Sequence, residues 1–307
     1  MKEKIKGYLK KLLNILKKPE LAILPANIAF YLILAIIPLL TVIVLLASSF
    51  GISIDMVANL VNNIMPKQVS DIIIEVISGK GFDRSVGVFN IMAFILASNG
   101  TYAIINTSDA LYKVENSDWI KKRISSIILL IIIIILFVFL IVVPIFGANI
   151  LSLMSQAKIF EGFIDEFTII FDVIKWPLTM LIVYFNIKLV YTMAPSKNIK
   201  SEETTYGAAF TTIVWALATF VFSFYLNNFA RYDILYGSLS SLIIMMVWVY
   251  FLSYIFVLGM AINVSRKEDQ VNKEEVTISE DKEKIIEEEK PIKKGKKAEK
   301  EVLIEKK

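Results

Sequence analysis

An otherwise apolar stretch of the chain is interrupted by Ser98, Asn99, Gly100 and Asn106. Asn99 and Asn106 are seven residues apart, so on a helix their amides lie on the same face. Two amides supply hydrogen-bond donors and acceptors, but no nucleophile and no general acid or base. This spacing therefore predicts binding, either of a small polar solute or of a neighbouring helix, and both alternatives stay open.

The side chains most often used in catalysis are absent. The chain contains no His and no Cys. This removes the commonest general base at neutral pH, the thiol nucleophile and the usual zinc ligands. Composition leaves open only a Mg²⁺ site made of carboxylates. The sequence therefore predicts that the protein is not an enzyme and has no cofactor and no metal site.

Four charged residues lie close to the ends of apolar stretches: Asp109, Asp172, Lys175 and Lys188. A charge at the centre of a bilayer costs about 2.5–3.5 kcal/mol on insertion scales, whereas a side chain near a helix end can reach the interface. We therefore interpret these residues as interfacial anchors in preference to solute ligands.

A compact turn near the C-terminal end of the apolar region contains Arg231, Tyr232, Asp233, Tyr236 and Gly237. Tyrosines are enriched where a membrane meets water. We interpret the segment as a salt-bridged outer turn with an aromatic interface belt, in preference to a solute-binding loop.

These residues need elements that position them, and the clearest is the stretch from Leu21 to Phe50. It contains no Asp, Glu, Lys or Arg and is longer than the roughly 20 apolar residues that cross a bilayer. Only a helix can make this crossing, since lipid offers the backbone no hydrogen-bond partner. Pro25 is expected at the helix entrance, and Pro38 is expected to kink the helix and free the carbonyl of Leu34.

Similar stretches recur along the chain, which is 56% hydrophobic with a mean hydropathy of +0.64. They predict an all-α polytopic membrane protein with six transmembrane helices, at about 26–50, 86–112, 124–151, 173–193, 206–229 and 237–263. Residues 51–84 are expected to form two amphipathic outer-loop helices broken at Pro66. Residues 158–172 are expected to form an acidic, aromatic loop.

Charge divides the chain into three parts. Residues 1–20 form a basic amphipathic helix suited to anionic lipids, 21–264 form the six-span membrane domain, and 265–307 form a disordered charged cytoplasmic tail. The N-terminal segment and the loops at 112–123 and 188–205 carry more Lys and Arg than the alternate loops. By the positive-inside rule, both termini are expected in the cytoplasm.

Four blocks of residues, in order and spacing, resemble the YihY/BrkB family of integral membrane proteins over about residues 20–264. The blocks are Ala29-Phe30-Tyr31 with Pro38-Leu39-Leu40; Ser98-Asn99-Gly100 with Asn106, Tyr112 and Glu115; Gly207-Ala208 with Trp215; and Tyr225, Phe229, Tyr232, Tyr236-Gly237-Ser238-Leu239, Trp248-Val249-Tyr250 and Leu258-Gly259 through Asn263. The chain departs from the family pattern in two places: family members often have Ser before a Phe-Pro pair where this chain has Ala35-Ile36-Ile37-Pro38, and they often have Glu where this chain has Ala261.

The resemblance implies a six-span protein of the bacterial inner membrane. The family has carried two labels, a ribonuclease and a serum-resistance virulence factor. The ribonuclease label conflicts with this sequence, because the chain has no His, no Cys and no cluster of metal ligands.

Two functions therefore stay open. One is a permease-like transporter that moves a small polar or anionic solute between spans one, two, five and six. The other is a non-transporting envelope or virulence scaffold that acts through the basic N-terminal helix and the charged tail.

Expected partners are the bilayer, anionic lipids at the N-terminal helix, a small solute and a second copy of the chain, without nucleic acid. Candidate solute-facing or bundle-polar residues are Asn99, Gly100, Asn106, Ser98, Tyr31, Pro38, Tyr236 and Gly237; candidate interfacial charges are Asp109, Asp172, Lys175, Arg231 and Asp233.

Overall fold

The computed structural model describes residues 20–49, 53–78, 87–114, 118–156, 164–269 and 271. Every regular element within these ranges is a helix, and none is a strand, which confirms the predicted all-α class. The chain divides into two units, Met1–Asn263 and Val264–Lys307. The basic segment 1–19 and most of the charged tail lie outside the described residues.

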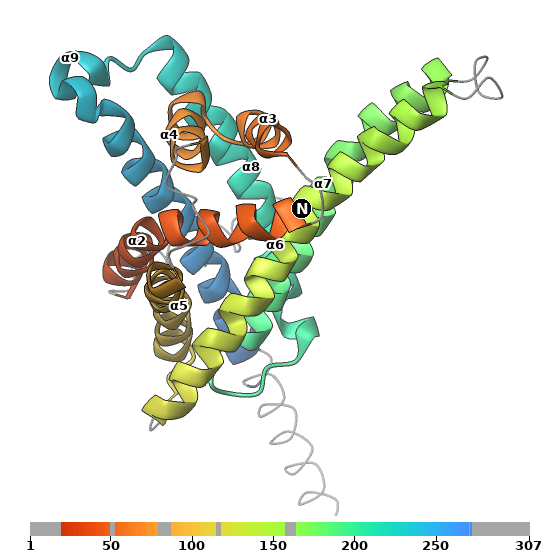
Figure 1. The fold of residues 1–307 in the computed structure, drawn as a ribbon. Coiled ribbons are helices and arrows are strands. Elements are labelled where there is room, and N and C mark those ends of the chain that lie inside the picture. Colours follow the sequence, from red (N-terminus) through yellow and green to blue (C-terminus); the bar gives the residue numbers. More distant parts are fainter. Residues whose placement is uncertain are drawn as a thin grey trace, which may run out of the picture. The chain divides into compact units, whose positions relative to one another are not determined.

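Six long helices within the described ranges fall at the positions of the predicted spans (Figure 1). They are α2 (Glu20–Ser49), α5 (Gly87–Leu111), α6 (Trp119–Gln156), α7 (Ile164–Met193), α8 (Thr205–Asn228) and a helix over residues 240–269. Shorter elements connect them: α3 (Ile54–Ile64), α4 (Lys67–Ser78), η2 (Ser201–Thr204), α9 (Tyr232–Tyr236) and η3 (Gly237–Leu239).

Length and hydropathy identify two membrane-span candidates in the part of the chain that the structure describes. These are Ser201–Asn228 and Tyr232–Asp269, and Leu21–Ile36 is a shorter apolar helix. One predicted loop is corrected by the structure: α7 begins at Ile164, so most of residues 158–172 is helical. Residues 164–172 contain neither Gly nor Pro, so nothing in their sequence prevents the helix from starting early.

The two amphipathic helices broken at Pro66 are confirmed as α3 and α4. The hydroxyl of Ser53 accepts a hydrogen bond from the backbone N–H of Met56 at 3.3 Å and so caps the start of α3. Pro66 separates the helices, and its carbonyl oxygen accepts from the N–H groups of Val69 and Ser70 at 2.9 Å. The apolar faces of α3 and α4 are thereby turned toward one core.

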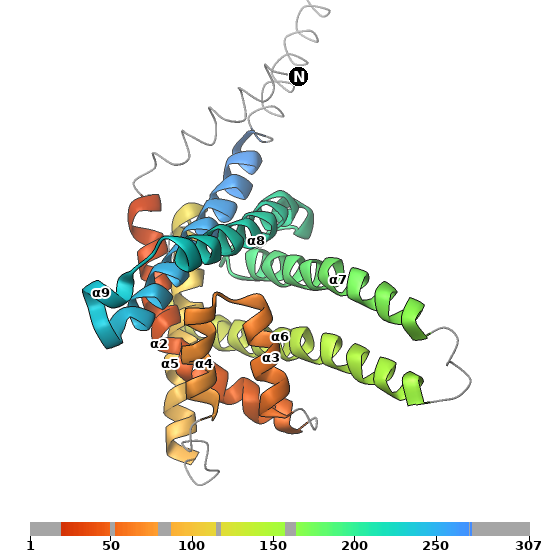
Figure 2. The same cartoon turned by 90° about the horizontal axis from the view of Figure 1, so that it is seen from above.

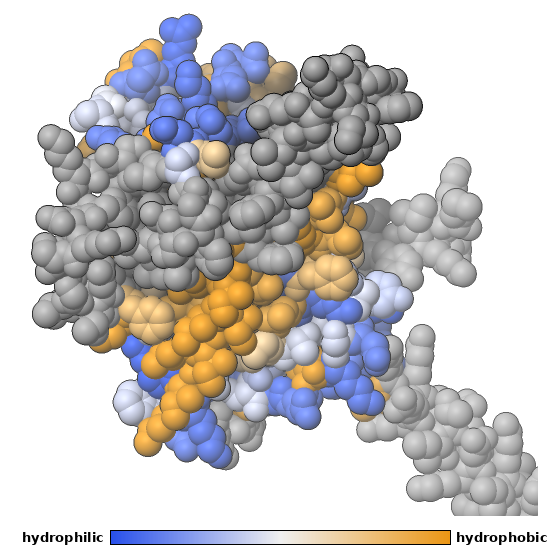
Figure 3. All heavy atoms as spheres, turned by 45° about the vertical axis from the view of Figure 1, so that its right-hand side comes forward, coloured by the Kyte–Doolittle hydropathy of each residue, from blue (hydrophilic) through white to orange (hydrophobic). Residues whose placement is uncertain are grey.

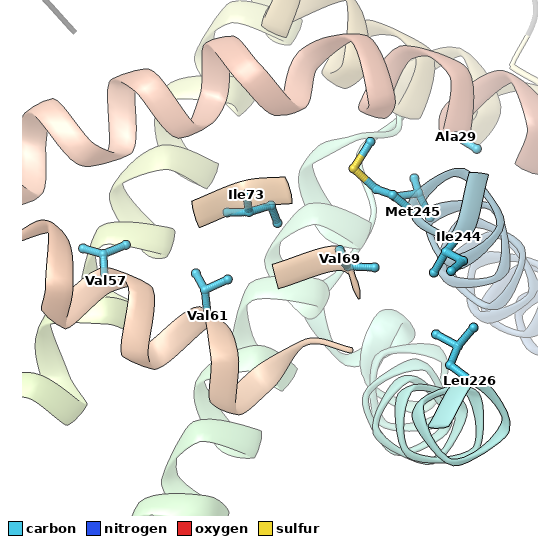
Figure 4. Packing of buried hydrophobic residues seen from close by; sticks show 9 residues of the cluster. Ala29, Val57, Val61, Val69, Ile73, Leu226, Ile244 and Met245 are labelled. Atoms are coloured by element: carbon cyan, nitrogen blue, oxygen red, sulfur yellow. The ribbon is translucent and has the colours of Figure 1, made fainter. Parts of the chain in front are cut away.

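That core lies where α3 and α4 meet α2, α8 and the helix over 240–269 (Figure 4). Its buried members are Ala29, Val57, Val61, Val69, Ile73, Leu226, Ile244, Met245 and Val249. The exposed faces of α3 and α4 are polar, and they carry Asp55, Asn59, Asn62, Lys67, Asp71 and Glu75. The α3–α4 pair therefore caps the helices with an apolar underside and a polar outer surface.

α2 packs along α5, and the crossing at Gly100 leaves room for a Cβ atom. A Cβ atom placed on Gly100 of α5 would lie 3.6 Å from Leu32 Cδ2 and 3.7 Å from both Ala35 Cβ and the Tyr31 carbonyl oxygen. These are ordinary contact distances, so α2 and α5 touch at Gly100 without overlap. Figures 1 and 2 show that α2 bends along its length, so that its two halves point in different directions.

The outer face of α6 is an uninterrupted apolar stripe. Its exposed isoleucines recur at helical spacing: Ile120, Ile124, Ile128, Ile131 and Ile135. Figure 3 shows an apolar band running diagonally across this face. Lipid is the solvent in which such a stripe is stable, because in water it would expose a large contiguous apolar patch.

Candidate functional site

Polar side chains of α5 recur every three or four residues and form one face of that helix. They meet two cationic side chains at the start of α6. We call this group the polar seam, and its members are Asn99, Tyr102, Asn106 and Asp109 of α5 with Lys122 and Arg123 of α6. The seam thus joins two of the sequence-predicted polar residues, Asn99 and Asn106, to a predicted anchor, Asp109.

The first turns of α6 are held against α5 by hydrogen bonds that flank the seam. The Thr101 hydroxyl lies within donating distance of two carbonyl oxygens. The Ser126 carbonyl oxygen on α6 is 2.7 Å away, and the Ser98 carbonyl oxygen on α5 is 2.9 Å away. The hydroxyl of Ser126 in turn donates to the carbonyl oxygen of Arg123 at 2.7 Å. Asp118 caps α6 by accepting from the N–H of Ile120 at 3.0 Å. Of these contacts, the bond between Thr101 and Ser126 joins α6 to α5 beside Lys122 and Arg123, and the other two lie within the start of α6.

Arg123 forms the end of the seam nearer the middle of α5. Its Nη1 donates to Asn99 Oδ1 at 2.8 Å, and its guanidinium carbon lies 6.0 Å from the centroid of the Tyr102 ring. Within the described ranges, no carboxylate pairs with this half-buried guanidinium. A guanidinium has five N–H donors, and the bond to Asn99 uses one of them.

Asp109 forms the other end, where three elements meet. Its Oδ1 accepts from the Ser196 N–H at 2.7 Å, and its Oδ2 accepts from the Ser196 hydroxyl at 2.7 Å and from Lys122 Nζ at 2.9 Å. Lys122 Nζ also donates to Asn106 Oδ1 at 3.3 Å. We call Asp109, Lys122 and Ser196 the Asp109 clasp, because it ties α5 and α6 to the loop after α7.

Asp109 is deeply buried within the protein. Its exposed fraction is 3%, and both carboxylate oxygens are used within the protein. A buried charge is tolerated where it is paired and hydrogen-bonded, and the clasp supplies both conditions. Asp109 is therefore enclosed by the protein, and its interpretation as an interfacial anchor stays a prediction.

Tyr112 follows the last residue of α5 and so lies outside that helix, beside the clasp. Burial and, to a smaller extent, the nearby Glu203 carboxylate together raise the pKa of the Tyr112 phenol to about 12. The phenol therefore stays neutral at physiological pH.

A second polar group holds α7, α8 and the helix over 240–269 together. The Tyr191 hydroxyl donates to the Phe256 carbonyl oxygen at 2.6 Å, so it accepts from the Thr211 hydroxyl, 2.7 Å away. The N–H of Gly207 donates to Asn263 Oδ1 at 2.7 Å. A Cβ atom on Gly207 would overlap the carbonyl oxygen of Gly259, so only glycine fits this crossing. The group packs helices and presents no uncommitted charge.

The remaining predicted residues are distributed elsewhere. Ser98 is buried, and its hydroxyl donates to the Ile95 carbonyl oxygen of its own helix at 2.8 Å. Gly100 faces α2, not the seam. Tyr31 packs edge-to-face on Phe30, with ring centroids 5.3 Å apart. The side chains of three further predicted residues lie outside the described part: Pro38, Asp172 and Lys175.

The predicted turn at residues 231–237 contains α9 and the start of η3, and its place on the outer side stays a prediction. The rings of Tyr232 and Tyr236 stack with centroids 6.1 Å apart. Gly237 ends α9 with a φ of +53°, a conformation that favours glycine. In this described segment, Arg231 and Asp233 are exposed and form no ion pair with each other, so the expected salt bridge is absent. Water competes effectively for such exposed charges.

From the sequence, Lys122 and Arg123 serve only as basic loop residues that indicate the orientation of the chain. Their contacts with α5 were not predicted. The available signal was the basic run at 121–123, directly before a predicted span and following an α5 face with polar residues at helical spacing. In the described residues, no group of three or more His, Cys, Asp or Glu is arranged to hold a metal ion.

Comparison with known proteins gives consistent matches. The family model described as Virulence factor BrkB matches residues 16–284. YfkH of Bacillus subtilis (strain 168), named as a ribonuclease-like protein, is 29% identical over 242 residues, which are 78% of this chain and 87% of YfkH.

Two relatives carry the name UPF0761 membrane protein. IL2447 of Idiomarina loihiensis is 27% identical over 135 residues, 43% of this chain and 47% of the relative. A protein of Coxiella burnetii (strain Dugway 5J108-111) is 28% identical over 120 residues, 36% of this chain and 43% of the relative. Each match therefore spans less than half of that relative's length. No solved structure matches the chain.

Proposed function

Because this chain belongs to the Virulence factor BrkB family of membrane proteins, we propose that it is a permease-like protein that moves a small anionic solute across the bacterial inner membrane. Family membership confirms the resemblance carried by the motifs of residues 20–264. It establishes a membrane protein; the transport activity, the solute and the inner-membrane location are proposals.

The single observation that carries the proposal is the state of Arg123. Its guanidinium is half-buried between helices and contacts an amide and an aromatic ring, with no carboxylate partner among the described residues. A cation withdrawn from water is stabilised by an anion that can accept several of its N–H groups. A small anion passing along the seam would supply this partner, and Asn99 would add an amide donor beside it.

The charges of the seam favour a singly charged solute. Lys122 is already paired with Asp109 at 2.9 Å, whereas Arg123 is not paired with a carboxylate of the seam. The seam therefore carries one net positive charge, and one negative charge on a solute balances it. A doubly charged anion would bring an unbalanced charge between the helices, which is unfavourable in a low dielectric.

The ribonuclease name belongs to YfkH and is not transferred. This chain has neither His nor Cys, and the Ser196 hydroxyl meets a carboxylate, Asp109, that is already paired with Lys122 and bonded to the Ser196 N–H. The seam consists of two amides, one phenol, two cations and one carboxylate that accepts three hydrogen bonds. These groups bind and orient a solute and do not cleave one.

We expect the chain in liposomes to move nitrate or lactate and to exclude sulfate and succinate. In Arg123→Gln, the flux of the monovalent anion should fall at least about tenfold, because the charge-assisted hydrogen bonds of Arg123 to the anion, worth roughly 1.5–3 kcal/mol, are lost. The measurement is the uptake of each labelled anion into proteoliposomes. Lys121→Gln is the matched control, since Lys121 is an exposed cation on the same turn of α6 and should leave the flux unchanged.

Three outcomes separate the parts of the proposal. Absence of flux for every anion contradicts the permease and favours a scaffold. Equal flux of monovalent and divalent anions contradicts the charge argument alone. Equal flux in Arg123→Gln and the unsubstituted protein, with both eluting as folded protein from a sizing column, contradicts the role of Arg123.

A further inference from the structure

The connection between α8 and the helix over 240–269 exposes large apolar side chains where a water-facing turn is ordinarily polar. We call these residues the apolar corner: Phe229, Ile234, Leu235 and Leu239, with exposed fractions of 69%, 69%, 78% and 58%. Figures 1 and 2 show α9 at the junction of the two helices.

The apolar corner continues the exposed apolar sides of the helices that it joins. Phe220 and Phe224 are exposed on the last turns of α8, and Leu242 and Met246 are exposed on the first turns of the next helix. Both helices belong to the segments that are long and apolar enough to cross a membrane. The apolar sides of these helices therefore lead into the corner from both directions, with the exposed amides of Asn227 and Asn228 at the end of α8, just before Phe229.

Ala230 and Tyr232 of the connection pack, partly buried, against the core of the flanking helices, whereas α9 and η3 contain no buried residue. Leu226, Ile244 and Met245 are buried against α3 and α4, and Figure 4 shows them directed toward Val69 and Ile73. The corner is thus held in place by a core, and its apolar residues remain on the outside.

Polar groups near the corner mark where the lipid would end. The exposed residues of α3, including Asn59 and Asn62, are polar. Arg231 and Asp233 are exposed beside the stacked rings of Tyr232 and Tyr236. Tyrosine rings and long charged side chains are found at the headgroup level of membranes.

From this continuity we infer that the apolar corner inserts into the acyl-chain region of the bilayer and binds lipid directly. The turn between these two helices is therefore a membrane anchor and not a water-exposed loop. The partner is the lipid bilayer itself, recognised by apolar area, with Arg231 and Asp233 at the headgroups. This inference does not depend on whether the protein transports a solute.

The chain contains no cysteine, so a thiol-reactive probe labels only the one cysteine that is introduced. We would place an NBD fluorophore on Leu235→Cys, and on Asn62→Cys as the matched control from exposed α3, in the full chain in proteoliposomes. Leu235→Cys should show blue-shifted emission, strong quenching by lipids with nitroxide-labelled acyl chains, and weak quenching by iodide on both sides of the membrane. Asn62→Cys should show the reverse.

Two results would overturn the inference. In the first, iodide quenches Leu235→Cys as strongly as Asn62→Cys, which would place the corner in water. In the second, Leu235→Cys forms a disulfide-linked dimer and is shielded from the nitroxide lipids, which would identify a second copy as the partner. Ile234→Cys provides an independent position if the first variant does not fold, because Ile234 is also exposed.

Discussion

Replacing Asp109 by Ala should lower the free energy of unfolding by about 3 kcal/mol, near the lower end of the cost of breaking a buried ion pair. The substitution leaves the Lys122 amine with only Asn106 and leaves the N–H and hydroxyl of Ser196 without their acceptor. The lower end applies because the Lys122 side chain keeps 16% exposure and can recover some hydration. The measurement is chemical or thermal unfolding of the purified protein in detergent.

The cause is isolated by two comparisons. Asp71→Ala removes an exposed carboxylate from α4 and should change the stability by less than about 0.5 kcal/mol. Adding Lys122→Ala to Asp109→Ala removes the unpaired cation and should restore part of the loss. A loss in Asp109→Ala no larger than in Asp71→Ala would show that the clasp contributes little to stability.

Replacing Gly207 by Ala should cost about 3 kcal/mol, at the upper end of what overpacking ordinarily costs. The new methyl group would overlap the carbonyl oxygen of Gly259 and the amide of Asn263, so α8 and the following helix must separate. Separation would also weaken the hydrogen bond from the Gly207 N–H to Asn263 Oδ1. The same unfolding measurement applies.

Gly100→Ala is the matched control, because it makes the same chemical change on another buried helix surface. Its Cβ would lie 3.6–3.7 Å from its neighbours, in ordinary contact, and Ala favours the helix over Gly by about 1 kcal/mol. We expect Gly100→Ala to be neutral or stabilising. Equal losses in Gly207→Ala and Gly100→Ala would contradict the close crossing at Gly207.

The close crossing at Gly207 was largely predictable from the sequence. Gly207, Ala208 and Thr211 are small residues on one stretch of a predicted span, and small residues permit close helix contact. Their partner was not predictable, because Gly259 and Asn263 lie some fifty residues further along the chain. Pairing over such a distance depends on how whole helices pack, and no local pattern records it.

The candidate site shows the same limit more clearly. Sequence spacing placed Asn99 and Asn106 on one helix face, and this was correct because helical periodicity is local. It did not show that Lys122 and Arg123 meet this face, or that Asp109 is enclosed by Ser196 from beyond α7. Those contacts depend on the rotation and register of α6 and α7 against α5.

By itself, the sequence determined the helical class, the positions of the long apolar helices and the break at Pro66. Apolar run length, 3.6-residue periodicity and the missing N–H of proline act within a few residues of one another. Tertiary structure alone decided that Asp109 is buried, that Arg123 faces an amide in place of a carboxylate, and that the corner at Leu235 is apolar on its outer side. The reason is that a side chain's environment is set by which helix lies opposite, and that choice is made by packing.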